Sequence, residues 1–167
     1  MAEKTAEVRA RELMSKHWAG YPVDPWLIAD REGLEVRYSS TLPDDVAGVI
    51  ARESPESPII VMINRNDSLR RQRFTLAHEL GHYTKLKDEG RINNRLGFVE
   101  HRDELSSQGT DPIEIDANKF AAELLMPAEA IRIWSKGGTV FNAVQNILDV
   151  SKEALLNRYK TLGIPYV

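Results

Sequence analysis

The residues of this chain best suited to chemistry are two histidines four positions apart, His78 and His82, in the segment FTLAHELGHYTKL. Positions four apart on an α-helix project only about 40° from each other, so a helix here would point both imidazoles the same way. Two neutral imidazoles presented in that way can share one tetrahedral metal ion, with metal–nitrogen distances of about 2.0–2.1 Å. The spacing therefore predicts part of a metal site.

Glu79 directly follows the first histidine and completes a His-Glu-x-x-His pattern. It would lie roughly 100° further round the helix, so it cannot easily be a third ligand, but it can reach a water on the metal. A metal lowers the pKa of such a water, and a carboxylate can take its proton. The pattern indicates a metallohydrolase with Glu79 as the general base.

The plainer alternative is an amphipathic helix that carries two histidines by chance. Apolar and small neighbours would turn the pair inward, namely Phe74, Ala77, Leu80 and Gly81. Two buried histidines without a metal would each need partners for both ring nitrogens. Gly81 costs a helix about 1 kcal/mol relative to alanine, which a close approach by another element would justify. These features favour the metal site.

The composition limits what else can bind the metal. The chain has no cysteine, so histidine and carboxylate must supply the ligands. Two further histidines fit less well. We expect His17 to be a surface or packing residue of an N-terminal helix, and His101 to be a solvated loop residue in the polar stretch FVEHRDELSSQGTD.

The segment TDPIEIDANKFAAELLMP supplies the best candidate for the third ligand. Asp111 suits a helix N-cap and Pro112 the first helical position. Glu114 then has two possible roles, either the carboxylate of a capping box or a metal ligand. Asn118 would lie one turn later on the same face, where its amide can orient a ligating imidazole. We prefer Glu114 as the ligand and keep Asp116 in reserve.

The elements that must position these residues follow from hydrophobic periodicity. Two N-terminal helices are predicted, over 3–18 and from Asp24 to Gly33. Three strands follow at 34–38, 46–51 and 59–63, the last two joined by a hairpin-like connection. Helical signals return after Asn66 and continue to the end.

This order predicts an α+β fold with a small antiparallel sheet. Along the chain, the N-terminal helices come before the sheet. The His-Glu-x-x-His helix, a third-ligand helix and C-terminal helices come after it. The length of 167 residues suits a single domain over 1–167, with a C-terminal helical part at about 128–167. The net charge of −3 argues against a surface built throughout for nucleic acid. No signal peptide or membrane-length apolar run is visible, so we expect a cytoplasmic protein.

Two motifs in order, RQRFTLAHELGHY and EIDANKFAAELLMP, closely resemble the ImmA/IrrE family of bacterial metallopeptidases. The resemblance extends over most of the chain and is weak in the first twenty or so residues and over 86–110. It implies a compact zincin-like fold, with His78, His82 and Glu114 as metal ligands and Glu79 as the general base. One Zn²⁺ per chain is the expected cofactor, although other divalent metals are possible.

The resemblance also implies a substrate class. The resemblance implies cleavage of a helix-turn-helix transcriptional repressor that is encoded nearby. The expected partner is therefore a protein substrate, and we expect no direct contact with nucleic acid or with a membrane. An extended substrate could add to an exposed sheet edge, for which PIIVMIN is the expected strand. Tyr83 and Arg73 are candidates to stabilise an oxyanion, although a packing tyrosine and a solvated arginine are the preferred interpretations. Differences in a lid or in specificity would lie between Lys87 and Gly109.

A DNA-binding regulatory module is the rival interpretation. The segment AVQNILDVSKEALLNRYKTLG resembles a helix-turn-helix, with Ser151 as an N-cap before a helix that carries Lys152 and Arg158. Glu153 and the apolar residues beside it favour packing over base reading. A cluster of arginines around the start of the motif helix indicates an anionic partner or a nearby carboxylate, although a solvated face is the default interpretation; its members are Arg65, Arg70, Arg71 and Arg73.

Overall fold

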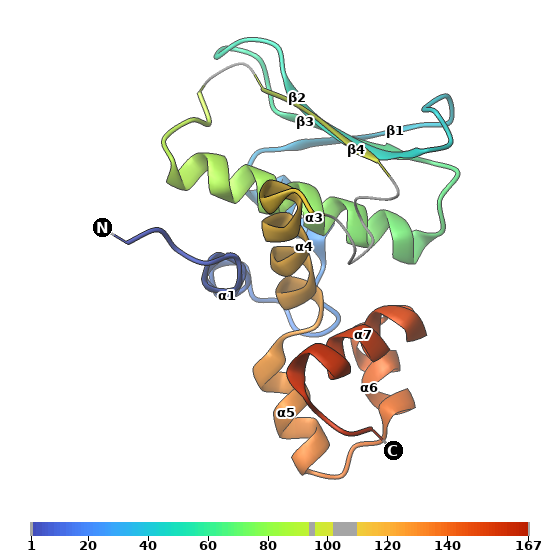
Figure 1. Ribbon diagram of the computed structural model, residues 1–167. Helices are drawn as coiled ribbons and strands as arrows, with labels where there is room; N and C mark the ends of the chain where they lie inside the picture. Colours follow the sequence, from blue (N-terminus) through green and yellow to red (C-terminus); the bar gives the residue numbers. More distant parts are fainter. Residues whose placement is uncertain (1, 94–95, 102–109, 167) are drawn as a thin grey trace.

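The computed structural model describes residues 2–93, 96–101 and 110–166, and this part of the chain forms seven helices and one four-stranded sheet (Figure 1). The helices are α1 (Ala6–Lys16), α2 (Pro25–Arg31), α3 (Leu69–Asp88), α4 (Pro112–Leu125), α5 (Ala128–Lys136), α6 (Phe141–Leu148) and α7 (Lys152–Leu162). The strands are β1 (Glu35–Ser39), β2 (Val46–Arg52), β3 (Ile60–Asn64) and β4 (Leu96–His101). The predicted α+β class is confirmed.

The sheet is mixed, in the order β1-β3-β2-β4. The predicted β2–β3 hairpin is present, and β2 is antiparallel to both β3 and β4. The prediction of an antiparallel sheet is wrong for β1, which runs parallel to β3. The chain reverses direction twice between these two strands, which leaves them running the same way, and β1 then pairs with β3 instead of with β2.

Two further expectations about the sheet are wrong. His101 is the last residue of β4 and is paired with Val46, so its backbone is in a strand and not in a loop. The rest of the polar stretch, 102–109, lies outside the described residues. Strand β3, which contains most of PIIVMIN, lies between β1 and β2 and therefore cannot receive a substrate strand at a sheet edge.

Helix α3 packs against one face of the sheet, and α1 and α4 lie on the side of α3 that is turned away from the sheet (Figure 1). The hydroxyl of Ser68 caps the first turn of α3 by accepting a hydrogen bond from the Arg71 amide at 3.2 Å. Every residue from 75 to 84 is buried. Leu76 and Leu80 belong to the same buried cluster as Ile50 of β2 and Val61 and Ile63 of β3. The motif helix is thus the centre of the molecule.

Helix α4 crosses α3 at Gly81. A Cβ atom at Gly81 would lie 3.1 Å from the Ala117 Cα and 3.1 Å from the Phe120 Cβ, too close for a rigid backbone neighbour. The predicted reason for a glycine inside the motif, a close approach by another element, is confirmed. Helix α4 begins as predicted, with the Asp111 carboxylate accepting from the Ile113 amide at 2.9 Å and Pro112 in the first turn.

The C-terminal helices α5, α6 and α7 gather at the far end of α4 (Figure 1). Leu155 and Tyr159 of α7 are buried in the cluster that contains the α3 leucines, and Arg158 is buried as well. These residues face the interior, which favours the packing interpretation of this segment over base reading. Among the described helices, none is long and apolar enough to cross a membrane.

Candidate metal centre

The structure brings His78, His82 and Glu114 together between α3 and α4. The Nε2 atoms of the two histidines lie 3.1 Å apart. His78 Nε2 is 2.9 Å from Glu114 Oε2, and His82 Nε2 is 3.3 Å from Glu114 Oε1. All three residues are buried, and one ligand atom from each falls within a group no wider than 4.8 Å.

This spacing suits a divalent cation. Ligand atoms about 2.0–2.1 Å from a tetrahedral ion lie about 3.3–3.4 Å from one another, close to the 2.9–3.3 Å between the histidine nitrogens and the Glu114 oxygens. Two imidazole nitrogens and a carboxylate directed at one point bring three electron pairs together. Among the described residues, no other group of at least three histidine or acidic side chains has metal-binding spacing.

Asn118 fixes the orientation of one imidazole. Its Oδ1 lies 2.8 Å from His78 Nδ1. An amide oxygen only accepts hydrogen bonds, so His78 Nδ1 is the donor and the lone pair of His78 Nε2 is directed at the other two ligand atoms. Asn118 lies one turn after Glu114 on α4, so a single helix supplies both a candidate ligand and the group that orients a second one.

Glu79 lies on the face of α3 that is turned toward β2, and it is completely buried. A Cβ atom at Gly48 of β2 would lie 3.5 Å from Glu79 Oε1 and only 2.6 Å from the Thr75 Cγ2. Gly48 therefore keeps open the space beside this carboxylate. Sequence reasoning missed it, although a glycine inside the β-branched run VAGVIA is a signal of close approach.

The reserve ligand Asp116 lies outside the histidine cluster. Its carboxylate forms an ion pair with the buried guanidinium of Arg9 and lies 3.9 Å from the Lys85 Nζ. The Asp111 carboxylate caps the Ile113 amide of α4, while the carboxylate of Glu114 reaches the two histidines.

Tyr83 is directed away from the histidines toward Glu32. Its hydroxyl donates to Glu32 Oε2 at 3.0 Å, and His17 Nε2 lies 2.6 Å from the other oxygen of the same carboxylate. Burial alone would raise the pKa of Glu32, but hydrogen bonds from His17, Lys16, Lys87 and Tyr83 hold that pKa well below its usual range. Tyr83 and His17 thus have structural partners away from the candidate centre.

Arg73 is buried, so the expectation of a solvated arginine is wrong. Its guanidinium donates at 2.7 Å to each of three backbone carbonyls, those of Val23, Leu148 and Asp149. Burial lowers the pKa of this group. Carbonyls at the end of α6 are partners that no local pattern in the sequence displays. The neighbouring Arg70 pairs with the Asp149 carboxylate at 3.0 Å, which is the nearby carboxylate that the arginine cluster indicated.

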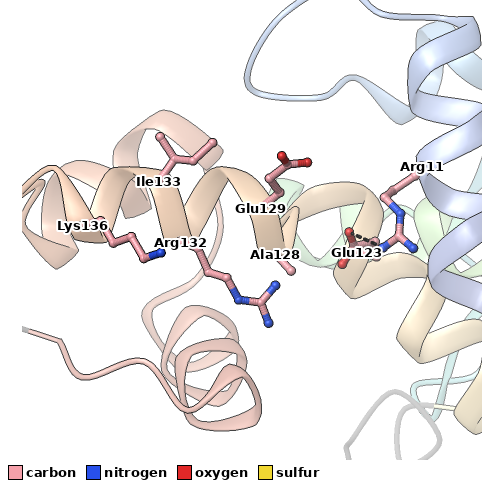
Figure 2. Close-up of a pocket in the computed structure, with 7 residues that line it drawn as sticks. All are labelled: Arg11, Glu123, Ala128, Glu129, Arg132, Ile133 and Lys136. Atoms are coloured by element: carbon pink, nitrogen blue, oxygen red, sulfur yellow. Dashed lines mark hydrogen bonds and ion pairs between the residues drawn. The ribbon is translucent and has the colours of Figure 1, made fainter.

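A separate pocket of about 480 Å³ lies between α1, α4 and α5 (Figure 2). Its lining side chains come from Arg11, Glu123, Ala128, Glu129, Arg132, Ile133 and Lys136, none of which is a candidate metal ligand. Arg11 Nη1 lies 3.3 Å from Glu123 Oε1 at one end of the pocket, so two of the charged side chains that line it are paired with each other. Among the described residues, the side chains suited to bind a metal meet at His78, His82 and Glu114, and none of them lines this pocket.

Comparisons with known proteins show the family of the chain. The family model for the IrrE N-terminal-like domain, peptidase M78, matches residues 29–160, a range that includes every candidate residue of the centre. The radiation response metalloprotease IrrE of Deinococcus deserti is 33% identical over 128 residues, which cover 75% of this chain and 42% of that protein. The chain thus spans less than half the length of this curated relative.

A solved structure of a Mycobacterium tuberculosis transcriptional regulator has a similar fold. The TM-score is 0.63 at 20% sequence identity, over 96% of this chain and 47% of the regulator. At that identity the likeness concerns the fold alone.

Proposed function

Because the chain belongs to the IrrE N-terminal-like family of M78 peptidases, we propose that it is a metal-dependent endopeptidase that hydrolyses a peptide bond in a protein substrate. The observation that carries this proposal is the convergence of His78, His82 and Glu114, with Glu79 next to one of them on the same helix.

In this proposal His78, His82 and Glu114 hold one divalent cation, with Zn²⁺ as the expected ion. When bound, such an ion supplies Lewis-acid chemistry, which polarises a carbonyl and makes water more acidic. Asn118 holds the His78 ring in the tautomer whose Nε2 can bind the ion.

Glu79 is the general base. It takes a proton from the attacking water while the water oxygen forms a bond to the carbonyl carbon of the substrate. It then gives that proton to the amide nitrogen as the carbon–nitrogen bond breaks, so the products are a carboxylate and an amine. The burial of Glu79 limits competing contacts with bulk water.

The outer edge of β4 is the proposed place for an extended substrate. Gly48 of β2, which lies beside the Glu79 carboxylate, is paired with Glu100 of β4. In the described sheet the open edges belong to β1 and β4, and β1 is separated from β2 by β3. A peptide added to the outer edge of β4 would therefore be separated from Gly48 by one strand, β4, and backbone hydrogen bonds would provide affinity.

The proposed substrate is a helix-turn-helix transcriptional repressor encoded near the gene of this protein, and the proposed location of the reaction is the cytoplasm. The support is the family resemblance of the two motifs and the match to a family that includes a metalloprotease. Cleavage of a repressor would relieve repression.

The proposal is tested by incubating the zinc-loaded protein with the repressor from a neighbouring gene. We expect two fragments whose masses add up to that of the repressor plus one water, and no cleavage after chelation. Glu79→Gln with an equal metal content is the matched control, and we expect it to cleave about 10²–10⁴-fold more slowly. An intact repressor, or cleavage at the same rate by Glu79→Gln, would contradict the proposal.

A further inference from the structure

Arg9 of α1 joins three segments of the chain from a buried position. Its side chain is 2% exposed. The guanidinium donates to the Lys4 carbonyl at 2.9 Å and to Thr84 Oγ1 at 3.4 Å, and it forms an ion pair with the Asp116 carboxylate. A single rigid group on α1 thus connects the segment that precedes this helix with α3 and α4.

Two of these contacts lie two residues beyond a candidate metal ligand. Thr84 follows His82 on α3, and Asp116 follows Glu114 on α4. The Thr84 hydroxyl also donates to the Gly81 carbonyl at 3.1 Å. Gly81 is the residue at which the two helices touch. Arg9 therefore links both ligand-bearing helices beside their crossing point.

The contact at Gly81 stops the helices from moving closer, but it does not stop one from sliding or turning against the other. A planar guanidinium with donors in a fixed fork restrains those motions, because its hydrogen bonds require one relative placement of Thr84 and Asp116. The candidate ligand atoms of His82 and Glu114 lie 3.3 Å apart across the same crossing. A small shift between the helices would move them directly.

We propose that Arg9 is a positioning residue for the metal centre, which sets the placement of Glu114 relative to His78 and His82. The inference rests on the proposed metal site. Buried ion pairs contribute little net stability compared with apolar packing, and their best-attested use is to fix one arrangement of the parts that they join. Groups that support metal ligands from outside typically change metal affinity by about 10–100-fold.

The test measures Zn²⁺ affinity of the full chain by competition with a chromophoric chelator, together with the melting temperature of the metal-free protein. We expect Arg9→Met to bind Zn²⁺ about 10–100-fold more weakly. Simple electrostatics predicts the opposite sign, because this change leaves the negative charge of Asp116 near the centre without its guanidinium. An affinity equal to or greater than that of the unchanged protein would overturn the inference.

Arg158→Met is the matched control. Arg158 is also buried and paired with a buried carboxylate, Glu123, but at the other end of α4. We expect it to lower the melting temperature of the metal-free protein at least as much as Arg9→Met, with Zn²⁺ affinity within about threefold of the unchanged protein, well below an outer-shell effect. An equal loss of affinity in both variants would mean general destabilisation and would overturn the inference.

Arg9→Lys keeps the charge but not the fork, and it decides the question if Arg9→Met does not fold. We expect weaker Zn²⁺ binding than in the unchanged protein and stronger binding than in Arg9→Met. Unchanged binding in Arg9→Lys would assign the effect to charge and overturn the positioning role. If the unchanged protein itself binds no Zn²⁺, the proposed metal site fails, which is a different result.

Discussion

The two ends of α4 each bury a carboxylate, and their surroundings differ in kind. At the first end, Glu114 meets the Nε2 atoms of His78 and His82. At the other end, Glu123 is paired with the guanidinium group of Arg158 and with that of Arg11, the second of which Figure 2 shows. Burial alone therefore does not distinguish a metal ligand from a structural acid.

The difference lies in where the compensating charge comes from. A buried carboxylate is costly unless positive charge and hydrogen bonds accompany it. Glu123 receives that charge from the chain itself. Glu114 faces two imidazoles, and together the three side chains form a ligand set that suits a divalent cation, which would bring positive charge from outside the chain. The two acids suggest variants that separate metal binding from stability.

The largest effect is expected at the metal end. Glu114→Gln removes a charged ligand while keeping the shape of the side chain, and we expect Zn²⁺ affinity to fall by more than about 100-fold, the upper figure for losses outside the ligand set. Chelator competition measures it. Glu123→Gln is the control and should bind Zn²⁺ as the unchanged protein does. Equal affinities of the two variants would remove the distinction between the two ends.

Without metal, we expect the Glu123 end of α4 to contribute more to stability than an exposed ion pair does. Glu123→Gln leaves the buried Arg158 without its carboxylate, and breaking a buried pair costs about 3–5 kcal/mol in the free energy of unfolding. Denaturant unfolding of the metal-free protein measures this. Arg70→Gln disrupts the exposed pair with Asp149 and should change that free energy by only about 0–1 kcal/mol. Similar losses in the two variants would contradict the account.

A change beside Glu79 should affect activity without removing the metal. Gly48→Ala places a methyl group 2.6 Å from the Thr75 Cγ2, so either the Thr75 side chain or one of the two segments must shift. Overpacking of this kind costs about 1–3 kcal/mol in the free energy of unfolding. We expect slower cleavage with Zn²⁺ affinity retained, measured on the same preparation. Unchanged cleavage would show that the space beside Glu79 is not needed.

The smallest effect concerns a third buried acid, Glu32, which resembles Glu123 because cations and hydrogen-bond donors from the chain surround it. Its pKa is lower in the folded protein than in the unfolded chain. The unfolded chain therefore binds the proton first as the pH falls, and this contribution to stability, present above the ordinary carboxyl range, is lost on acidification. Glu32→Gln should flatten the decline of unfolding free energy below about pH 5. An unchanged slope would contradict this.

Much of the centre could be predicted because its signals are local. The spacing of His78 and His82 needs only the period of a helix, and the start of α4 follows from Asp111 and Pro112. The two helix starts that were predicted with a proline after a cap are present, at Asp24 and Asp111. Capping and periodicity are properties of neighbouring residues, so the sequence displays them directly.

What could not be predicted depends on partners that are distant in the sequence. The parallel pairing of β1 with β3 is a matter of which strand edge is open once the hairpin forms. Arg73 was expected in solvent because its partners are backbone carbonyls, which have no signature in the sequence. The ion pair between Arg9 and Asp116 joins residues 107 positions apart in the sequence. No local pattern indicates that two charged residues on different helices are in contact. The extent of a single domain over 1–167 stays a prediction.

The most direct test of the central claim is the metal content of the purified chain. The protein is loaded with Zn²⁺, dialysed at neutral pH and measured by elemental analysis, beside His82→Ala treated in the same way. We predict about one metal per chain for the unchanged protein, as three ligands around one ion require, and far less for a folded His82→Ala. An unchanged protein that emerges empty, or a His82→Ala that holds as much Zn²⁺, would contradict the account.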